Sequence, residues 1–222
     1  MNRIRSVVIF GATSFIASNL IRKLLKFDVT CVVRNKTSKI HGMEKIVSYD
    51  DFCNKNPQAY DFALDFASNV SVEKFINSPI SSFLENLEIP IMHLKLLNDI
   101  KFNGRYILVS SDRALVNNPG GSYLNEVEVG NDPYGASKYF AETIIGYGSQ
   151  ILSGQFTVIR LPNVYGAEQT SQQLIPSIIS QIMSGNNEIY VNSFDGNRNY
   201  LHIEDAVDAI QRFLEKPLDY RN

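Results

Sequence analysis

The hydrophobic positions of this chain fall into short continuous runs that alternate with longer segments of helical period. Residues 6–10 form a continuous apolar run that ends at Gly11, and residues 15–26 follow with apolar side chains at helical spacing. A short apolar run bounded by a turn residue predicts a buried strand, whereas a period near 3.6 predicts a helix. The chain therefore begins with a predicted strand, turn and helix.

The same alternation continues to the end of the sequence. Further strands are predicted at 28–33, 45–48, 61–66, 105–110 and 157–161, and further helices at 82–100, 134–152, 174–183 and 204–214. The helix at 82–100 has an apolar stripe formed by Leu84, Leu87, Ile91, Leu94 and Leu97. Continuous apolar strands separated by helices indicate an α/β protein with a doubly wound parallel sheet, covered by helices on both faces.

Composition agrees with an ordinary globular protein of one or two domains. Hydrophobic residues make up 44% and charged residues 20% of the 222 residues, which argues against disorder and fibrous repeats. The formal net charge is -2, so no overall charge favours a nucleic acid or an anionic membrane surface as partner. Any site for an anion must therefore be local.

The cysteines and the first residues bear on metal binding and location. Cys31 and Cys53 form no CxxC motif and have no histidine pair nearby, so we expect free thiols and no metal site. The first apolar run is too short for a secretory signal, and far shorter than the roughly 18 residues that span a bilayer. We therefore expect a cytoplasmic protein.

The turn after the first predicted strand is a candidate phosphate site, because ligands of a doubly wound sheet bind at the carboxyl ends of its strands. It reads GATSFIA over residues 11–17. A glycine here permits a tight bend, and the following helix offers free N–H groups to a pyrophosphate. Only Gly11 is glycine, and Ser14 and Ala17 occupy the other two places. Alone, the turn is also compatible with an ordinary strand-to-helix connection.

The ends of the second and third predicted strands suggest which dinucleotide is bound. Arg34 and Lys36 follow the second strand, where an acidic residue usually meets a ribose 2′-hydroxyl and an arginine meets a 2′-phosphate. This favours NADP(H) over NAD(H), although both charges could instead be solvated. Asp50 and Asp51 follow the third strand, where they could contact the adenine amine or cap a helix.

Tyr134 and Lys138 are the candidates for acid/base chemistry. Their spacing of four places the phenol and the ammonium on one helix face, where the cation can stabilise a phenolate. Lowering a tyrosine pKa from about 10 to near 7 requires roughly 4 kcal/mol, which one charge at about 4 Å supplies at an effective dielectric of about 20. Ser111, at the end of the preceding strand, could hold a carbonyl oxygen while the tyrosine transfers the proton.

Motifs occur in a fixed order along nearly the whole chain: GATSFIA at 11–17, FAS at 66–68, Asn86, LVSS at 108–111, the Tyr134/Lys138 pair, RLPNVYG at 160–166 and GNRNYLHIED at 196–205. In this order they resemble the extended short-chain dehydrogenases/reductases of the nucleotide-sugar epimerase/dehydratase family. The resemblance implies a Rossmann fold, an NAD(P) cofactor and a nucleotide-sugar substrate. It also implies a homodimer built from the 82–100 helix and the helix that carries Tyr134.

The resemblance also implies roles for individual residues. Tyr134 would be the general acid/base, Lys138 would lower its pKa and hold the nicotinamide ribose, and Ser111 would polarise the reacting sugar oxygen. The candidates for cofactor binding are Gly11, Thr13, Ser14, Phe15, Ile16, Arg34, Lys36, Asp50, Asp51, Phe66, Ala67, Ser68, Tyr134, Lys138 and Pro162. The candidates for substrate binding are Ser111, Asp112, Asn163 and Arg198, of which the last two would contact the diphosphate.

The chain departs from the family pattern in ways that bear on the reaction. Asp112 is followed by Arg113, where sugar 4,6-dehydratases carry an Asp-Glu pair, and arginine cannot accept a proton at neutral pH. Elimination is therefore disfavoured. The basic residues after the second strand then favour a 4-ketoreductase that uses NADP(H), with a 4-epimerase using bound NAD as the alternative. A non-catalytic cofactor-binding or scaffold protein is a third possibility, against which the retained acid/base set argues.

The family comparison also predicts how the chain is divided. We expect a dinucleotide-binding domain at 1–166, a partial substrate-binding region at 167–200 and a returning helix at 201–222. Family members usually continue past this last helix, so we expect either a compact or a truncated substrate region. The turn-rich segment 114–132 is the predicted mobile loop.

Overall fold

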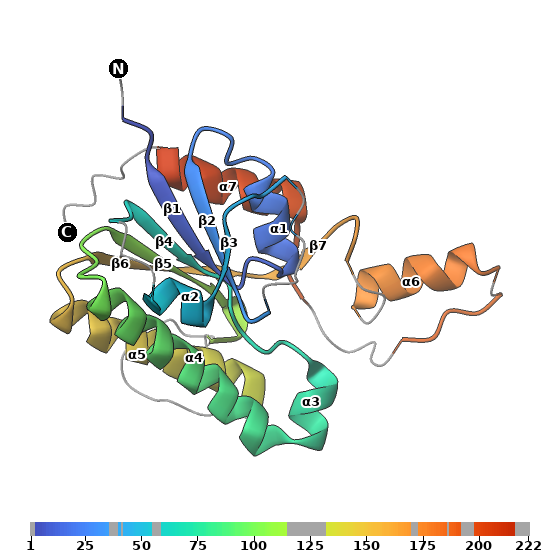
Figure 1. Cartoon of the computed structure of the whole chain (residues 1–222). Helices are drawn as coiled ribbons and strands as arrows, with labels where there is room; N and C mark the ends of the chain where they lie inside the picture. The colour runs from blue at the N-terminus through green and yellow to red at the C-terminus, as the bar shows by residue number, and fades with distance from the viewer. Residues whose placement is uncertain are drawn as a thin grey trace.

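The computed structural model describes residues 3–35, 40, 42–54, 59–114, 132–169, 173–185, 187–191 and 198–215. Its centre is a six-stranded, entirely parallel sheet with the strand order β3-β2-β1-β4-β5-β6 (Figure 1). The strands are β1 (Ser6–Phe10), β2 (Asp28–Val33), β3 (Ile46–Ser48), β4 (Phe62–Asp65), β5 (Arg105–Ser111) and β6 (Gln155–Leu161). The predicted doubly wound α/β architecture is confirmed.

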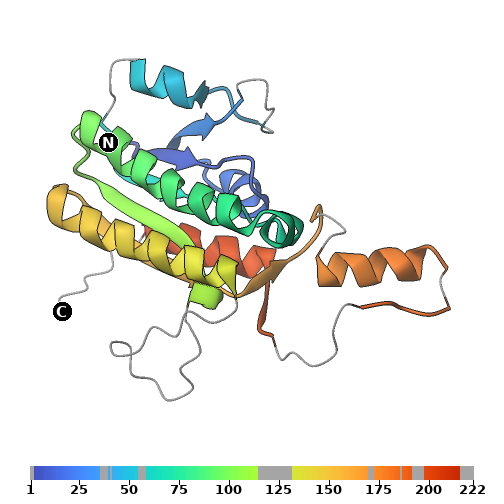
Figure 2. The ribbon, with the colours of Figure 1, turned by 90° about the horizontal axis from the view of Figure 1, so that it is seen from below.

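Helices cover both faces of this sheet. One face carries α1 (Phe15–Ile21) and α7 (Ile203–Glu215), and the other carries α2 (Tyr49–Asn54), α4 (Pro79–Asp99) and α5 (Pro133–Ile151). Figure 2 shows α4 and α5 lying side by side, with α7 on the opposite side of the sheet. The remaining helices are α3 (Val72–Asn77), η1 (Asp112–Ala114) and α6 (Leu174–Met183).

Alternation along the strands builds the two halves of the core. In β1, Val7 and Ile9 pack toward α1 and α7, whereas Val8 and Phe10 pack toward α4 and α5, and all four are fully buried. Because both faces are covered, the strand reads as an uninterrupted apolar run. In β4 the same alternation places Asp65 on the face covered by α4 and α5, together with Ala63. Leu64 lies on the opposite face.

A second, smaller sheet lies at one end of the molecule. It pairs β7 (Asn163–Tyr165) with β8 (Tyr200–His202) in parallel, and α7 follows β8 directly. Between these strands the chain runs out to α6, which projects away from the main body in both views (Figures 1 and 2). No residue of α6 is buried.

The sequence placed most elements within a few residues, with one larger error. The helix predicted at 15–26 ends at Ile21, because turns at residues 23, 24 and 27 lead the backbone into β2. The helix α3, the 3-10 helix η1 and the small sheet are not predicted as elements, whereas a helix at Asp50 and Asp51, found as α2, is one of the two alternatives for these residues. The predicted mobile loop lies almost entirely outside the described residues. Among the helices that are described, none is long and apolar enough to cross a membrane.

Candidate active site

The turn after β1 is built for close backbone contact. Gly11 has φ +70°, and a Cβ at this position would lie 2.6 Å from the backbone nitrogen of Ala67. Any side chain would therefore clash with the turn that follows β4. The two predicted cofactor turns, at Gly11 and at residues 66–68, thus lie directly against each other.

Polar groups around these turns fit a dinucleotide. The Ser14 hydroxyl caps α1 by accepting the N–H of Ala17 at 3.4 Å, while Thr13 is exposed beside it. The hydroxyl oxygens of Ser68 and Ser110 are buried and have no hydrogen-bond partner among the described residues. Buried hydroxyls without partners are costly, and a bound cofactor is one group that could satisfy them. Phe15 and Ile16, which follow Ser14, are partly buried and pack against the core.

Arg34 is already paired in this structure. Its guanidinium lies 2.6 Å from a carboxylate oxygen of Glu85 on α4, and the other oxygen of Glu85 accepts the amide of Asn69 at 2.8 Å. Burial acts to raise the pKa of Glu85, but these two hydrogen bonds lower it overall. A 2′-phosphate would therefore compete with Glu85 for Arg34. The predicted partner of Arg34 at this position, Lys36, lies outside the described residues.

The acidic residues after β3 lie in the first turn of α2. Asp50 and Asp51 occupy this turn, and the Ser48 hydroxyl accepts the N–H of Asp51 at 3.1 Å. The side chain that caps α2 is therefore that of Ser48, and not that of Asp50 or Asp51 as the sequence suggests. Their negative charges near the helix N-terminus are still favourable.

Ser111 and Tyr134 meet, as the sequence predicts. Ser111 is the last residue of β5, and its hydroxyl lies 3.2 Å from Asp112 and close enough to Tyr134 to act on the pKa of that phenol. Arg113 lies over the Tyr134 ring at 5.1 Å from its centroid and forms an ion pair of 2.6 Å with Asp132. Burial raises the pKa of Tyr134, although the charge of Arg113 and the Ser111 hydroxyl act to lower it.

Lys138 lies one helical turn after Tyr134 and is almost fully buried, with 5% of its surface exposed. Its ammonium donates to the carbonyl oxygen of Val109 at 3.2 Å. Burial lowers the pKa of Lys138, and the charges of Asp65 and Glu142 oppose this effect. The cation over the phenol ring is that of Arg113, so the predicted influence of Lys138 on the pKa of Tyr134 stays a prediction.

A hydrogen-bonded chain holds the start of α5. Asn86 of α4 donates to the Ser137 hydroxyl at 3.0 Å, and this hydroxyl donates to the Tyr134 carbonyl at 2.7 Å. On its other side, Asn86 pairs with the backbone of Asn69 through bonds of 2.6 and 3.0 Å. The turn after β4 and the helix of Tyr134 are thereby fixed to each other.

The predicted diphosphate contacts come together at the small sheet. The amide of Asn163 donates to the carbonyl of Asn199 at 3.3 Å, next to the exposed Arg198. Asn163 pairs with Tyr200 across the two strands, and this pairing brings Asn163 and Asn199, which are 36 positions apart in sequence, to one place. Pro162 forms the link between β6 and β7.

A buried polar cluster beside this site was not predicted. Asp65, His93 and Tyr106 are at most 1% exposed, and the carboxylate of Asp65 contacts both other side chains at 2.5 Å. Two signals in the sequence could have revealed it. Asp65 ends an otherwise apolar strand, and His93 lies in the middle of a long apolar helix.

The comparison with known families decides the affiliation. The sequence model of the "NAD dependent epimerase/dehydratase family" matches residues 7–221, nearly the whole chain. The chain belongs to this family. The relatives of this chain are nucleotide-sugar epimerases and dehydratases of the extended short-chain dehydrogenase/reductase type, as the sequence motifs imply.

Individual relatives are distant. The chain is 24% identical to a UDP-glucose 4-epimerase of Lactobacillus helveticus, over 91% of this chain and 70% of the relative. It is also 24% identical to an ADP-L-glycero-D-manno-heptose-6-epimerase of Brachyspira hyodysenteriae, over 95% of this chain and 72% of that protein.

Solved structures of the family share the fold. A UDP-glucuronic acid 4-epimerase from Bacillus cereus superposes with a TM-score of 0.79 at 17% identity, over 96% of this chain and 74% of the other. A dTDP-glucose 4,6-dehydratase from Streptomyces venezuelae gives 0.77 at 19% identity, over 95% and 72%. At these identities the similarity establishes the fold alone.

Proposed function

We propose that this protein oxidises and reduces a ring carbon of a nucleotide-linked sugar, with a nicotinamide cofactor accepting and supplying the hydride. The observation that carries the proposal is the placement of Ser111 at the end of β5, close enough to Tyr134 to act on its pKa, with the buried Lys138 one turn further along α5. These three side chains form a proton-transfer site next to the turns at Gly11 and Ala67.

Tyr134 supplies the proton. Since burial raises its pKa, the phenol is protonated at neutral pH and ready to donate to a sugar oxygen as a keto group is reduced. Ser111 can hold the same sugar oxygen at hydrogen-bond distance. Lys138 adds a positive charge in a buried site, where charge stabilisation is stronger than in water.

Asn163 and Arg198 are proposed to bind the diphosphate of the substrate. Arg198 is exposed next to β8, and a planar guanidinium suits phosphate oxygens. The relatives named above act on UDP- and ADP-linked sugars, which supports the same substrate class. Arg198 lies in the segment of residues 167–200, which also includes the projecting α6. We therefore propose this segment as the substrate-binding region.

The relatives do not distinguish a 4-epimerase that retains NAD from a 4-ketoreductase, and we place the epimerase first. The preference for a 4-ketoreductase using NADP(H) rested on Arg34 and Lys36. Arg34 is paired with Glu85, so a 2′-phosphate would have to displace this carboxylate, and Lys36 lies outside the described residues. The Arg34 guanidinium at the end of β2 is the observation that still favours the 4-ketoreductase. Arg113, paired with Asp132 in place of a second carboxylate, argues against 4,6-dehydration.

Cofactor binding and release distinguish the two forms. The protein is purified, any nicotinamide nucleotide it retains is identified, and NADH and NADPH are titrated separately by calorimetry. A retained NAD supports the epimerase. Free exchange with preference for NADPH supports the ketoreductase, and binding of neither nucleotide would contradict the proposed function.

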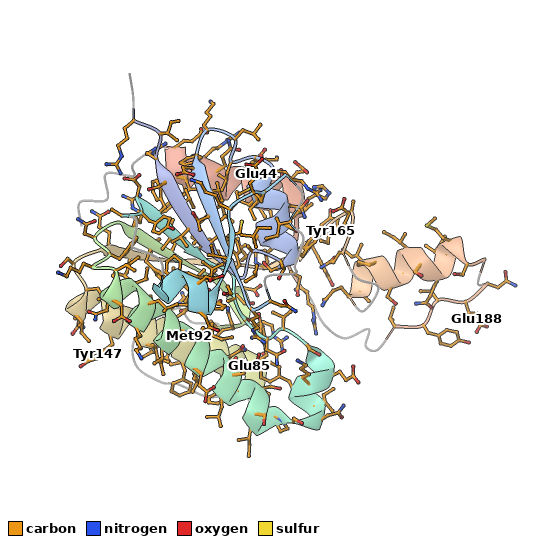
Figure 3. All side chains as sticks on the ribbon, viewed as in Figure 1. Glu44, Glu85, Met92, Tyr147, Tyr165 and Glu188 are labelled. Atoms are coloured by element: carbon orange, nitrogen blue, oxygen red, sulfur yellow. The ribbon has the colours of Figure 1, made fainter. Side chains whose placement is uncertain are left out.

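A homodimer through α4 and α5 is part of the proposal. Large apolar side chains are exposed on the outer sides of these helices, among them Met92 and Tyr147 (Figure 3). Leu84 and Ile91, half of whose surface is exposed, belong to the predicted apolar stripe and do not pack against the sheet. Sedimentation of the wild type and of Ile91→Asp tests this proposal, because an added charge in an apolar interface favours the monomer.

A further inference from the structure

The polar cluster beside the catalytic helix has a nearly complete set of hydrogen bonds. One oxygen of Asp65 receives the Tyr106 hydroxyl and contacts Nδ1 of His93, both at 2.5 Å, and the other accepts the N–H of Ala67 at 2.9 Å. On the far side of the imidazole ring, Nε2 lies 3.0 Å from the hydroxyl of Tyr49. The cluster therefore ties α4, α2 and β5 to the end of β4.

The cluster contains a buried carboxylate, that of Asp65. Burial raises the pKa of Tyr49, so its phenol is neutral and can donate to or accept from Nε2 of His93. Burial acts to raise the pKa of Asp65, but its contacts with His93, Tyr106 and Ala67 lower it overall. Asp65 is therefore an ionised carboxylate in the core.

Lys138 is the cation on the same face of the sheet. Asp65 is paired in register with Leu108 of β5, and the ammonium of Lys138 bonds the carbonyl of the next residue, Val109. Both charged groups are desolvated, and a buried charge is costly unless an opposite charge offsets it. The charge of Asp65 also acts against the fall in the pKa of Lys138 that burial causes.

The other charged groups around Lys138 have partners of their own. Glu142, one turn further along α5, is held by Arg160 of β6 through hydrogen bonds of 2.6 and 3.1 Å. Toward the start of α5, Arg113 pairs with Asp132, and Asp112 accepts from Ser111. The Tyr134 phenol is neutral in its resting state, because burial raises its pKa.

We propose that Asp65 is the buried counter-charge of Lys138 and a positioning residue for the site of Tyr134. It acts in two ways: its charge keeps the lysine protonated, and its bond to Ala67 holds the turn that packs against Gly11. His93 and Tyr106 fix the carboxylate in place. The catalytic consequence rests on the proposed function, whereas the charge pairing itself does not.

The direct test is a titration of Lys138 in the free protein. The ¹³Cε signals of its lysines are followed by NMR from neutral to alkaline pH, with Lys138 assigned through Lys138→Arg. In Asp65→Asn we expect its midpoint to fall by about one pH unit or more, as for a cation that loses a close opposite charge. An unchanged midpoint would overturn the proposal.

Tyr106→Phe is the matched control, because it removes a hydrogen bond from the same carboxylate but leaves the charge. Its Lys138 midpoint should stay close to that of the wild type, and an equal shift in both variants would show a structural effect only. If Asp65→Asn does not fold, Glu142→Gln provides the test. A small shift there supports Asp65 as the counter-charge, and a shift of about one unit assigns that role to Glu142 and overturns the proposal.

A second readout links the pair to catalysis. If the proposed function holds, the alkaline limit of turnover moves to lower pH in Asp65→Asn and not in Tyr106→Phe. The NMR titration needs neither substrate nor cofactor, so a protein without the proposed activity would still give a clear result for the charge pair.

Discussion

The sheet with its catalytic helix and the segment around α6 differ sharply in how they are built. Around β1, β4 and β5 most side chains are buried, and even polar ones such as Asp65 and Lys138 are enclosed and bonded. In α6 no residue is buried, although the helix carries Ile179, Ile182 and Met183. Figure 3 shows Glu188, just after α6, far from the sheet. Under the proposed function, the chemistry lies in the enclosed part and the substrate contacts lie in the exposed segment.

The largest expected effect lies in the enclosed part. Tyr134→Phe removes the proton donor but leaves the turns at Gly11 and Ala67 intact. We expect turnover to fall by about 10²–10⁴-fold, while cofactor affinity measured by calorimetry changes by a few fold at most. Turnover equal to that of the wild type would remove Tyr134 from the mechanism.

Stability provides the next contrast. Leu64 is fully buried in β4, so Leu64→Ala should lower the free energy of unfolding by about 2–5 kcal/mol. Ile182 of α6 is 57% exposed, and Ile182→Ala should change it by about 0.5 kcal/mol or less. Urea unfolding of both variants measures the difference. Similar losses would show that α6 is packed as tightly as the sheet.

The pH dependence follows from the raised pKa of Tyr134. A protonated phenol is needed for reduction, so the rate of reduction should stay level through neutral pH. Oxidation needs the phenolate, so its rate should rise as the pH increases above neutral. In Arg113→Gln the loss of a positive charge over the ring should move the oxidation profile to still higher pH. Profiles of kcat/KM for the two directions check this prediction, and an oxidation rate that falls with pH would contradict it.

The smallest expected effect concerns the choice of cofactor. Glu85→Gln leaves Arg34 without its anionic partner, so NADPH should bind more tightly relative to NADH. Because the pair is largely exposed, we expect a change of about fivefold or less. Calorimetry with both nucleotides measures the ratio, and Glu88→Gln on the exposed side of α4 is the matched control.

Arg34→Ala tests the same assignment from the other side. If Arg34 meets a 2′-phosphate, this variant should weaken NADPH binding much more than NADH binding. Equal weakening of NADPH and NADH binding would show that Arg34 does not contact the 2′-phosphate.

Hydrophobic period was sufficient to predict the middle of the sheet, because β2, β1, β4 and β5 are mostly apolar and mostly buried. It was insufficient for α4, because only part of the predicted apolar stripe, Leu94 and Leu97, packs against the core. Leu84 and Ile91 are exposed, whereas Asn86 and His93 are buried, since polar partners on β4 and α5 satisfy them. Period alone cannot show this, because it scores every polar residue as a surface residue.

The sequence predicts those site residues that belong to a local motif. It does not predict contacts between residues that are far apart in the chain. Ser111, Tyr134 and Lys138 follow from local motifs. The pairing of Arg34 with Glu85 joins residues 51 positions apart, and that of Asp65 with His93 joins residues 28 apart. Such contacts depend on how helices lie on the sheet, which the sequence alone does not specify.

The central claim is that this protein exchanges hydride with a nucleotide-linked sugar. The direct measurement mixes the protein, at concentrations comparable to the cofactor, with UDP-, dTDP-, GDP- and CDP-hexoses and NAD, and follows absorbance at 340 nm. The account predicts a rapid rise with at least one sugar nucleotide and a strongly reduced rise in Tyr134→Phe. A protein that binds NAD but gives no rise with any sugar, or the same rise in both forms, would contradict it.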